Sequence, residues 1–240
     1  MRKRRGGFMR KGAGQLLDKA GFVELMIAQQ VLQFGEFTLK SGRSSPYFFN
    51  LGNISDAAGT AALGAAYANK IAELGWEFDV IFGPAYKGIP IAVATGYALS
   101  ATTQQSSKVP TNPGISYNRK EAKTHGEGGV LVGANIQDQR VLIVDDVLTA
   151  GTAVREAMGA IEFAGGRVAG VLVALDRCEL LGTGSQKNLT AVEHLGEVLQ
   201  VPIASIVQLE DVIAYLDRKP VHLDAVTRVR AYRDAYCRGE

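Results

Sequence analysis

Apolar and polar residues follow two different periods along the chain, and these periods predict strands and helices in turn. Almost continuously apolar stretches, typical of strands buried on both faces, occupy residues 78–82, 141–144, 168–175 and 202–207. Helical spacing of apolar residues occurs at 16–34, 56–74, 88–100, 153–164 and 209–219. Because strands alternate with helices, we expect an α/β fold whose mostly parallel central sheet is flanked by helices.

The stretch EFTLKSGRSSPYFFNLG, residues 36–52, alternates in polarity and is interrupted by Gly42 and Pro46, which predicts a β-hairpin. We expect this hairpin to belong to a small N-terminal hood that covers largely residues 15–55. Hood and sheet together are expected to form a single domain, residues 15–240.

The first eleven residues, MRKRRGGFMRK, contain six Lys and Arg and no acidic residue. Without them the chain has 20 basic and 24 acidic residues, so the net charge of +2 becomes −4. We expect residues 1–14 to be a disordered basic tail, with an upstream start codon, an expression remnant, a nucleic-acid arm or a targeting peptide as alternatives. The body carries no basic stripe interleaved with aromatic residues, so no nucleic-acid partner is expected.

No apolar run reaches the roughly 18 residues that a membrane-spanning helix needs, so we expect no membrane partner. The two cysteines, Cys178 and Cys237, form no Cys-x-x-Cys pair, which argues against a disulfide framework or a zinc site. This use of cysteine is typical of a reducing compartment, and we expect a cytoplasmic location.

Polar residues follow three of the predicted strands, in the segments FGPAYKG, VDDVLTAGT and ALDR. The carboxyl ends of parallel strands share one edge of a sheet, where ligands bind, so we expect these segments to converge.

In VLIVDDVLTAGTA, residues 141–153, two acids end a strand and a Thr-Ala-Gly-Thr turn leads into a helix. The free N–H groups of the first helical turn suit a phosphate, and ionised carboxylates accept hydrogen bonds from a vicinal diol such as ribose. The string lacks Gly-Lys-Ser/Thr and Gly-x-Gly-x-x-Gly, so it is neither a nucleotide P-loop nor a dinucleotide-binding turn.

Two further segments could handle a second anion. In FGPAYKGIPIA, Gly83 and Gly88 allow close backbone approach and Lys87 adds a positive charge. The glycine-rich stretch YNRKEAKTHGEGG places four potential cations within seven residues: Arg119, Lys120, Lys123 and His125. Alone, these segments fit a plain strand-to-helix turn and a solvated charged loop. Beside a pyrophosphate site, however, the cations would stabilise the charge of a departing pyrophosphate and exclude water.

Together these motifs resemble those of type I phosphoribosyltransferases. VLIVDDVLTAGTA has the form of their signature for 5-phosphoribosyl 1-pyrophosphate (PRPP): four aliphatic residues, two acids and a Thr-x-Gly-Thr turn. FGPAYKGIPIA resembles their pyrophosphate loop, in which the family often has a non-proline cis peptide bond. RKEAKTHG resembles the catalytic loop of orotate phosphoribosyltransferases, while FTLKSGRSSPYFFNLG and LDR resemble the segments near orotate in that family.

This resemblance implies a transferase that converts orotate and PRPP to orotidine 5′-monophosphate and pyrophosphate in de novo pyrimidine biosynthesis. The two substrates are the expected small-molecule partners, and Mg²⁺, held mainly through the substrate, is the expected cofactor. The family also implies a homodimer in which the lid loop that carries RKEAKTHG completes the partner subunit's site.

The resemblance further implies roles for individual residues. Catalytic roles fall on Lys120, Lys123, His125, Asp145 and Asp146. Contacts to PRPP are expected at Lys40, Tyr86, Lys87, Arg119, Lys120, Lys123, His125, Asp145, Asp146, Val147, Leu148, Thr149, Ala150, Gly151, Thr152 and Ala153. Contacts to orotate are expected at Lys40, Phe48, Phe49, Thr149 and Arg177.

Other interpretations of these motifs stay open. A regulator with the same fold could bind PRPP as a signal, but it would have little need for the intact RKEAKTHG loop. A purine phosphoribosyltransferase would lack the FTLKSGRSSPYFF block. At single positions, Phe48 and Phe49 could be core aromatics, Arg177 a salt-bridge partner and Lys40 a solvated charge.

Overall fold

The structure is a computed structural model that describes residues 17–39, 42–101, 108–119, 130–148, 151–181, 189–219 and 223–237. Within these ranges, six strands form one sheet in the order β5-β4-β3-β6-β7-β8, and all neighbours are parallel except β4 and β5. The strands are β3 (Val80–Gly83), β4 (Gly114–Asn118), β5 (Leu131–Gly133), β6 (Arg140–Val147), β7 (Arg167–Asp176) and β8 (Ile203–Gln208).

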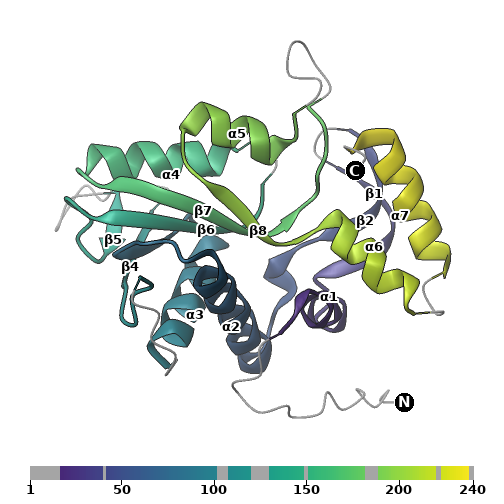
Figure 1. The fold of residues 1–240 in the computed structure, drawn as a ribbon, viewed down its shortest axis with the longest axis horizontal. Helices are drawn as coiled ribbons and strands as arrows, with labels where there is room; N and C mark the ends of the chain where they lie inside the picture. Colours follow the sequence, from purple (N-terminus) through teal and green to yellow (C-terminus); the bar gives the residue numbers. More distant parts are fainter. Residues whose placement is uncertain are drawn as a thin grey trace.

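Helices cover both faces of this sheet (Figure 1). One face carries α2 (Ala57–Leu74) and α3 (Gly88–Ala101), and the other carries α4 (Thr152–Phe163) and α5 (Ala191–Leu199). The central strands β3, β6 and β7 are largely apolar because both of their faces are buried. In β6, for example, Leu142 and Val144 pack in one hydrophobic cluster, whereas Val141 and Ile143 pack in the other. The predicted mostly parallel α/β sheet is confirmed.

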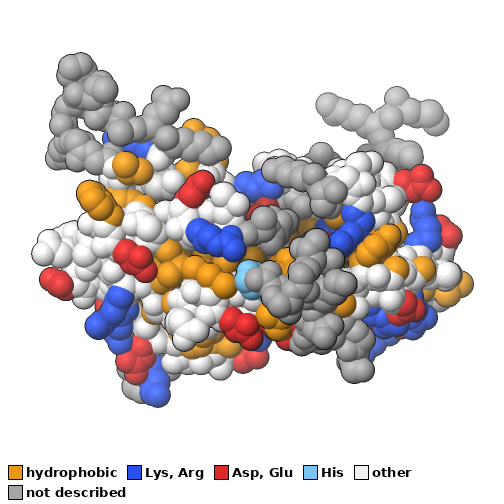
Figure 2. All heavy atoms as spheres, turned by 90° about the horizontal axis from the view of Figure 1, so that it is seen from above, with side chains coloured by type: hydrophobic (Ala, Val, Ile, Leu, Met, Phe, Trp, Pro, Cys, Tyr) orange, Lys and Arg blue, Asp and Glu red, His pale blue; other side chains and the backbone are white. Residues whose placement is uncertain are grey.

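The outer surface of α4 and α5 is mixed in character. Acidic and basic side chains are interspersed there, with apolar side chains exposed between them (Figure 2). Neither sign of charge dominates the described part of this face. Among the helices of the described ranges, none has the length and apolarity that a bilayer crossing requires.

The predicted hood lies at one end of the sheet, together with the two helices that follow β8 (Figure 1). It consists of α1 (Lys19–Ala28), the antiparallel pair β1 (Leu32–Thr38) and β2 (Ser44–Phe49), and the short turn η1 (Leu51–Asn53). Helix α6 (Leu209–Asp217) packs on α1, and α7 (Leu223–Tyr236) packs on β2.

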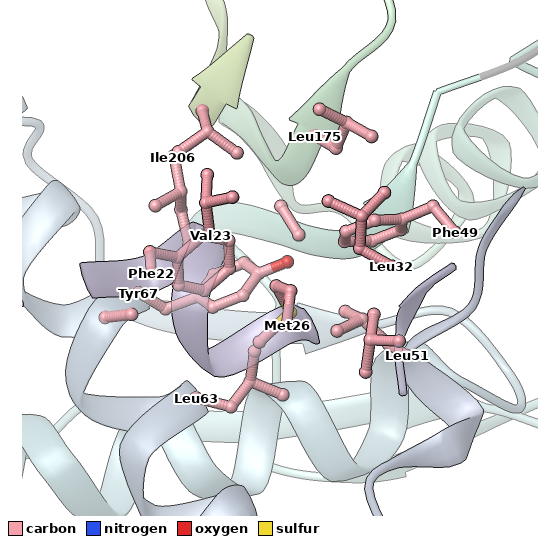
Figure 3. Close-up of a cluster of buried hydrophobic side chains, with 14 of the residues drawn as sticks. Phe22, Val23, Met26, Leu32, Phe49, Leu51, Leu63, Tyr67, Leu175 and Ile206 are labelled. Carbon is pink, nitrogen blue, oxygen red and sulfur yellow. The ribbon is translucent and has the colours of Figure 1, made fainter. Parts of the chain in front are cut away.

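Strand β2 joins the hood to the main core through one of its faces. Ser45, Tyr47 and Phe49 alternate along it and are buried, whereas the intervening Phe48 is exposed. Figure 3 shows Phe49 in the same buried cluster as Leu175 of β7. The hood therefore shares its hydrophobic core with the sheet.

One element differs from its sequence prediction. Helix α1 begins after Asp18, whose side chain accepts a hydrogen bond of 2.7 Å from Gly21 N, but it ends at Ala28. Gln30 is left-handed, with φ 56°, and β1 begins at Leu32, so the predicted helix through residue 34 was wrong there. Pairing of β1 with β2 overrides the helical spacing of the apolar residues, as tertiary contacts commonly do.

At the edge opposite the strand exits, one ion pair ties β6 to the turn before β3. Arg140 donates from Nε to Asp79 Oδ2 at 3.0 Å and from Nη2 to Oδ1 at 2.9 Å, and its backbone N–H also donates to Oδ2. These bonds to Arg140 lower the pKa of Asp79 to about 2. The carboxylate is therefore stabilised by the fold and is protonated only in strong acid.

We expect Asp79→Asn to lower the free energy of unfolding at pH 7 by about 1 kcal/mol, because charged hydrogen bonds are lost. The pKa of Asp79 is depressed in the folded state, so its contribution is present above about pH 4 and lost as the pH falls towards 2. Urea unfolding should show the gap between wild type and variant closing over that interval. Glu162→Gln, at an exposed position of α4, is the control. Equal stabilities at pH 7 would contradict the prediction.

Candidate functional site

The order of the strands creates a switch point between β3 and β6. The chain continues from β3 to β4 on one side, and it later resumes with β6 on the other side of β3. Loops that leave β3 and β6 at their carboxyl ends therefore diverge, and the space between them is the usual ligand site of such sheets. Two of the predicted segments, FGPAYKG and VDDVLTAGT, follow these two strands.

The loop after β3 is short and tightly wound. The Ala85–Tyr86 peptide bond is cis, as the resemblance led us to expect. Gly88 N donates to Pro84 O at 2.9 Å, which closes the turn into α3. A Cβ on Gly83 would overlap the Gly88 carbonyl, and one on Gly88 would lie 2.6 Å from Pro84 Cδ. The two glycines thus allow the two ends of the loop to pack closely against each other.

Hydrogen bonds hold this loop from both neighbouring strands. On one side, Ala85 N donates to Asn118 Oδ1 at the end of β4, at 2.9 Å. On the other side, Lys87 Nζ donates to Asp146 Oδ2 at the end of β6, at 2.8 Å. The Lys87 side chain is half exposed, so it remains accessible to a ligand. The sequence analysis did not identify Asn118 as a residue of the site. The one feature of the sequence that could have indicated it is the position of this amide side chain at a strand exit, directly before Arg119.

Strand β6 extends beyond the predicted 141–144 and includes both acids. Asp145 Oδ1 accepts a hydrogen bond from Asp146 N at 2.9 Å, and Asp146 Oδ1 accepts one from Val147 N at 2.8 Å. From α2, the buried Tyr67 donates its hydroxyl to Asp145 O at 2.7 Å. These bonds fix the backbone and orient one oxygen of each carboxylate, and the second oxygen of Asp146 accepts from Lys87.

The two carboxylates differ in their surroundings. Burial raises the pKa of Asp145 to about 7, and the neighbouring charge of Asp146 adds to this effect. Lys87 acts in the opposite direction, since its positive charge favours the ionised form of Asp145. A carboxyl group that changes charge near neutral pH is typical of a functional site rather than of a structural ion pair.

The start of α4 has the geometry of an anion site. Gly151 precedes the helix with φ 71°, a left-handed conformation that favours glycine, and its N-cap position provides no side chain to accept the first N–H groups. Thr152 and Ala153 are exposed there, whereas Leu148 is buried in the core. Thr149 and Ala150, also predicted to contact PRPP, lie outside the described residues.

The flanks of the predicted lid loop meet at the same edge. Arg119 N donates to Val130 O at 2.7 Å, directly beyond the paired Asn118 and Leu131. Arg119 is half-buried. The lid loop therefore leaves the sheet from β4, the strand next to the Ala85–Lys87 loop. Three predicted catalytic residues of this segment lie outside the described residues: Lys120, Lys123 and His125.

The predicted orotate contacts are only partly brought together. Phe48 is 38% exposed and stacks on Phe37, with ring centroids 5.5 Å apart, whereas Phe49 points into the core. Arg177 follows β7 and is buried on the same side of β2 as Phe49, with hydrogen bonds to other side chains. Phe48 can therefore offer its ring and Phe49 only its backbone. Lys40 lies outside the described residues.

A shallow depression adjoins the switch point. It has a volume of about 260 Å³ and lies between η1, α2 and the first turn of α3, where Tyr86 and Lys87 line it. Tyr86 is 66% exposed. This places both predicted PRPP contacts of the loop at the rim of a surface that a ligand can reach.

Comparison with known proteins identifies the family. The model of the phosphoribosyl transferase domain matches residues 50–185. The orotate phosphoribosyltransferase of Serratia proteamaculans is 49% identical over 215 residues, which cover 90% of this chain and 96% of the relative. That of Acinetobacter baumannii (strain ACICU) is 47% identical over 90% of this chain and 94% of its own.

A solved structure agrees with these sequence relatives. The crystal structure of the orotate phosphoribosyltransferase of Francisella tularensis matches with a TM-score of 0.75 and 33% identity, over 90% of this chain and 99% of that one. The chain therefore belongs to the phosphoribosyltransferases, and within them to the orotate phosphoribosyltransferase family.

Proposed function

We propose that the protein transfers the phosphoribosyl group of PRPP to orotate, forming orotidine 5′-monophosphate and pyrophosphate in pyrimidine biosynthesis. The observation that carries this proposal is the Lys87–Asp146 ion pair, which joins a pyrophosphate-type loop to the acidic end of β6 at the switch point. Membership of the orotate phosphoribosyltransferase family supports the choice of substrates.

The residues at the ends of β3 and β6 bind different parts of PRPP. The N–H groups of Gly151, Thr152 and Ala153 bind the 5′-phosphate at the positive end of α4. Asp145 and Asp146 accept hydrogen bonds from the ribose hydroxyls. Lys87 and the amides of its loop bind the pyrophosphate, with Arg119 and the lid residues Lys120, Lys123 and His125 above it. Orotate lies towards the hood, near Phe48, Phe49 and Arg177.

In the reaction, N1 of orotate gives up its proton to solvent or to the departing pyrophosphate and forms a bond to ribose C1, while the bond from C1 to the pyrophosphate oxygen breaks with its electron pair. Positive charge develops on the sugar and negative charge on the leaving group. Asp145 and Asp146 stabilise the positive charge on the sugar, and Lys87 stabilises the negative charge on the leaving group, because fixed charges close to a developing charge of opposite sign stabilise the transition state. Because Asp146 and Lys87 are already in contact, both signs of charge are in place beforehand.

We propose that Mg²⁺ binds mainly through substrate oxygens. Carboxylate oxygens such as those of Asp145 and Asp146 suit this cation chemically. Within the described ranges, however, no group of three or more His, Cys, Asp and Glu side chains could hold a metal ion. Bound Mg²⁺ supplies charge neutralisation on the pyrophosphate, and the protein needs only to position that group.

We also propose a homodimer in which the lid loop completes the partner's site. Helix α3 carries no charged residue from Gly88 to Ala101. Its exposed face bears Val93 and Tyr97, 48% and 70% exposed, and continues from the exposed Tyr86. An uncharged, apolar outer face beside the site favours burial against a second copy of the chain.

The location and the domain division are also proposals. The free cysteines, Cys178 and Cys237, favour the reducing cytoplasm. The core that β2 and β7 share favours a single domain over residues 15–240, to which the basic tail 1–14 is an appendage.

A spectroscopic assay of orotate with PRPP and Mg²⁺ tests the reaction. We expect orotate to be consumed, while adenine, guanine and hypoxanthine are not accepted. If a purine is accepted and orotate is not, the substrate assignment is wrong. If PRPP binds and no base is consumed, the protein is a regulator built on this fold.

Affinity for PRPP should depend on pH through Asp145. Its pKa of about 7 means that the ionised form, the better acceptor for a ribose hydroxyl, is lost as the pH falls. We expect the dissociation constant of PRPP to rise up to roughly tenfold between pH 8 and pH 6, since the ionised fraction of a group with a pKa of about 7 falls from about 90% to about 9% over this interval. Asp145→Asn should bind PRPP weakly with a flatter profile. The phosphates of PRPP titrate in the same way with both proteins. If the dissociation constant changes with pH equally in wild type and in Asp145→Asn, Asp145 is not the group responsible.

Mixing two inactive variants tests the shared site. Lys123→Ala lacks a lid cation, and Asp145→Asn combined with Asp146→Asn lacks the diol site. If the lid acts across the dimer, mixing equal amounts should restore about a quarter of wild-type activity, because half of the dimers are mixed and each has one intact site. Adding Tyr97→Glu to both variants should prevent the recovery. No recovery with Tyr97 intact, despite exchange of subunits, would show that the lid serves its own subunit.

A further inference from the structure

Arg177 lies inside a buried polar cluster that joins three parts of the fold. It follows β7, and its side chain is only 9% exposed. Its Nε donates to Glu179 Oε1 at 2.6 Å, and its Nη2 donates to Ser45 Oγ of β2 at 3.3 Å and to Tyr232 Oη of α7 at 3.4 Å. The guanidinium is thus hydrogen-bonded to residues from three places: the segment after β7, the hood strand β2 and the C-terminal helix α7.

Glu179 and Tyr232 are also bonded to each other. The Tyr232 hydroxyl donates to Glu179 Oε1 at 2.6 Å, so the same carboxylate oxygen receives both Arg177 and Tyr232. The second oxygen, Oε2, accepts from Arg43 Nη1 of the hood at 3.2 Å. Removing the Tyr232 hydroxyl would therefore break one bond to Arg177 and one bond to the carboxylate that orients Arg177.

Aromatic rings fix the plane of the guanidinium. Arg177 lies over the Tyr47 ring, 4.4 Å from its centroid, and Tyr232 meets the same ring edge-on at 5.9 Å. A guanidinium that is stacked and hydrogen-bonded has little rotational freedom left, and its remaining donors have a defined direction. Preorganisation of this kind increases affinity by reducing the entropy lost on binding.

Arg43 and Arg177 share the single carboxylate of Glu179. The buried Asp176 lies beside them, but its side chain accepts a hydrogen bond from Cys178 N. Burial lowers the pKa of the Arg177 guanidinium, but the interactions with Tyr47 and Glu179 raise it, so that the pKa lies above its ordinary value. A buried guanidinium that shares its carboxylate with a second arginine can bind a further anion through its remaining donors, and orotate is a planar carboxylate.

The position of the Arg177 cluster in the fold is consistent with orotate as the partner. Leu175, two residues before Arg177, pairs with Val147 of β6, which directly precedes the phosphate-binding turn. On the hood side, Ser45 and Tyr47 belong to the same strand as Phe48 and Phe49. The cluster therefore connects the sugar-phosphate end of the site with the strand that would cover the base.

We propose that Glu179 and Tyr232 are positioning residues that fix Arg177 for recognition of the orotate anion, so that α7 sets the affinity for the pyrimidine. The proposal rests on the proposed function and extends it to a part of the chain that carries no recognisable motif. Neither residue is proposed to touch the reacting atoms; both act through Arg177.

The test compares Tyr232→Phe, which keeps the ring, with wild type in steady-state kinetics. We expect KM for orotate to rise roughly fivefold, the effect of losing about one hydrogen bond, with KM for PRPP and kcat nearly unchanged. Tyr215→Phe is the matched control, since it removes a hydroxyl from a buried tyrosine of α6 outside the cluster. Equal increases in both KM values, or a lower melting temperature with no change in KM for orotate, would show a structural role only.

A double-mutant cycle tests whether Tyr232 acts through Arg177. Arg177→Lys keeps the charge but loses the planar fork, and we expect it to raise KM for orotate more than Tyr232→Phe does. Adding Tyr232→Phe to Arg177→Lys should then have little further effect. Fully additive effects would overturn the proposal. A wild-type protein that does not use orotate would instead refute the proposed function, so the two failures are distinguishable.

Discussion

The ion pair between Lys87 and Asp146 connects the two strand ends at which the sheet changes direction, and much of the site is arranged around it. Lys87 can reach Asp146 because the loop after β3 turns within four residues, which the close contact of Gly83 and Gly88 permits. Asp146 lies within reach of Lys87 because β6 continues beyond its apolar residues 141–144. In the pair, the positive charge of Lys87 neutralises the carboxylate of Asp146.

Asn118 extends this arrangement to the lid. By accepting the Ala85 N–H group, it connects the loop after β3 to the strand from which the lid loop leaves. Arg119 then pairs with Val130 across the base of that loop. The loop after β3 is thus tied to the end of the neighbouring strand β4 by the hydrogen bond between Ala85 and Asn118.

The sequence was sufficient for the sheet and for the strand exits, because strands buried on both faces are apolar at every position and parallel strands share their exit edge. It was insufficient where contacts distant in sequence decide the structure. Residues 29–34 have helical spacing, yet pairing with β2 makes Leu32 the start of a strand. The predicted hairpin implied that the adjacent Phe48 and Phe49 face opposite sides, but nothing in the pattern indicated which of the two is buried, or that Arg177 meets Ser45 and Tyr232.

The packing of α7 on β2 has a consequence for how the protein is made. About 180 residues separate the hood strand from the helix that covers it, and such distant contacts form late because a long loop must close first. During synthesis the sheet can assemble while α7 is still inside the ribosome, but Arg177 lacks Tyr232 until the helix emerges. The Arg177 cluster is therefore completed last, and a chain truncated before residue 223 would keep the loops after β3 and β6 but lack the helix that packs on the hood strand β2.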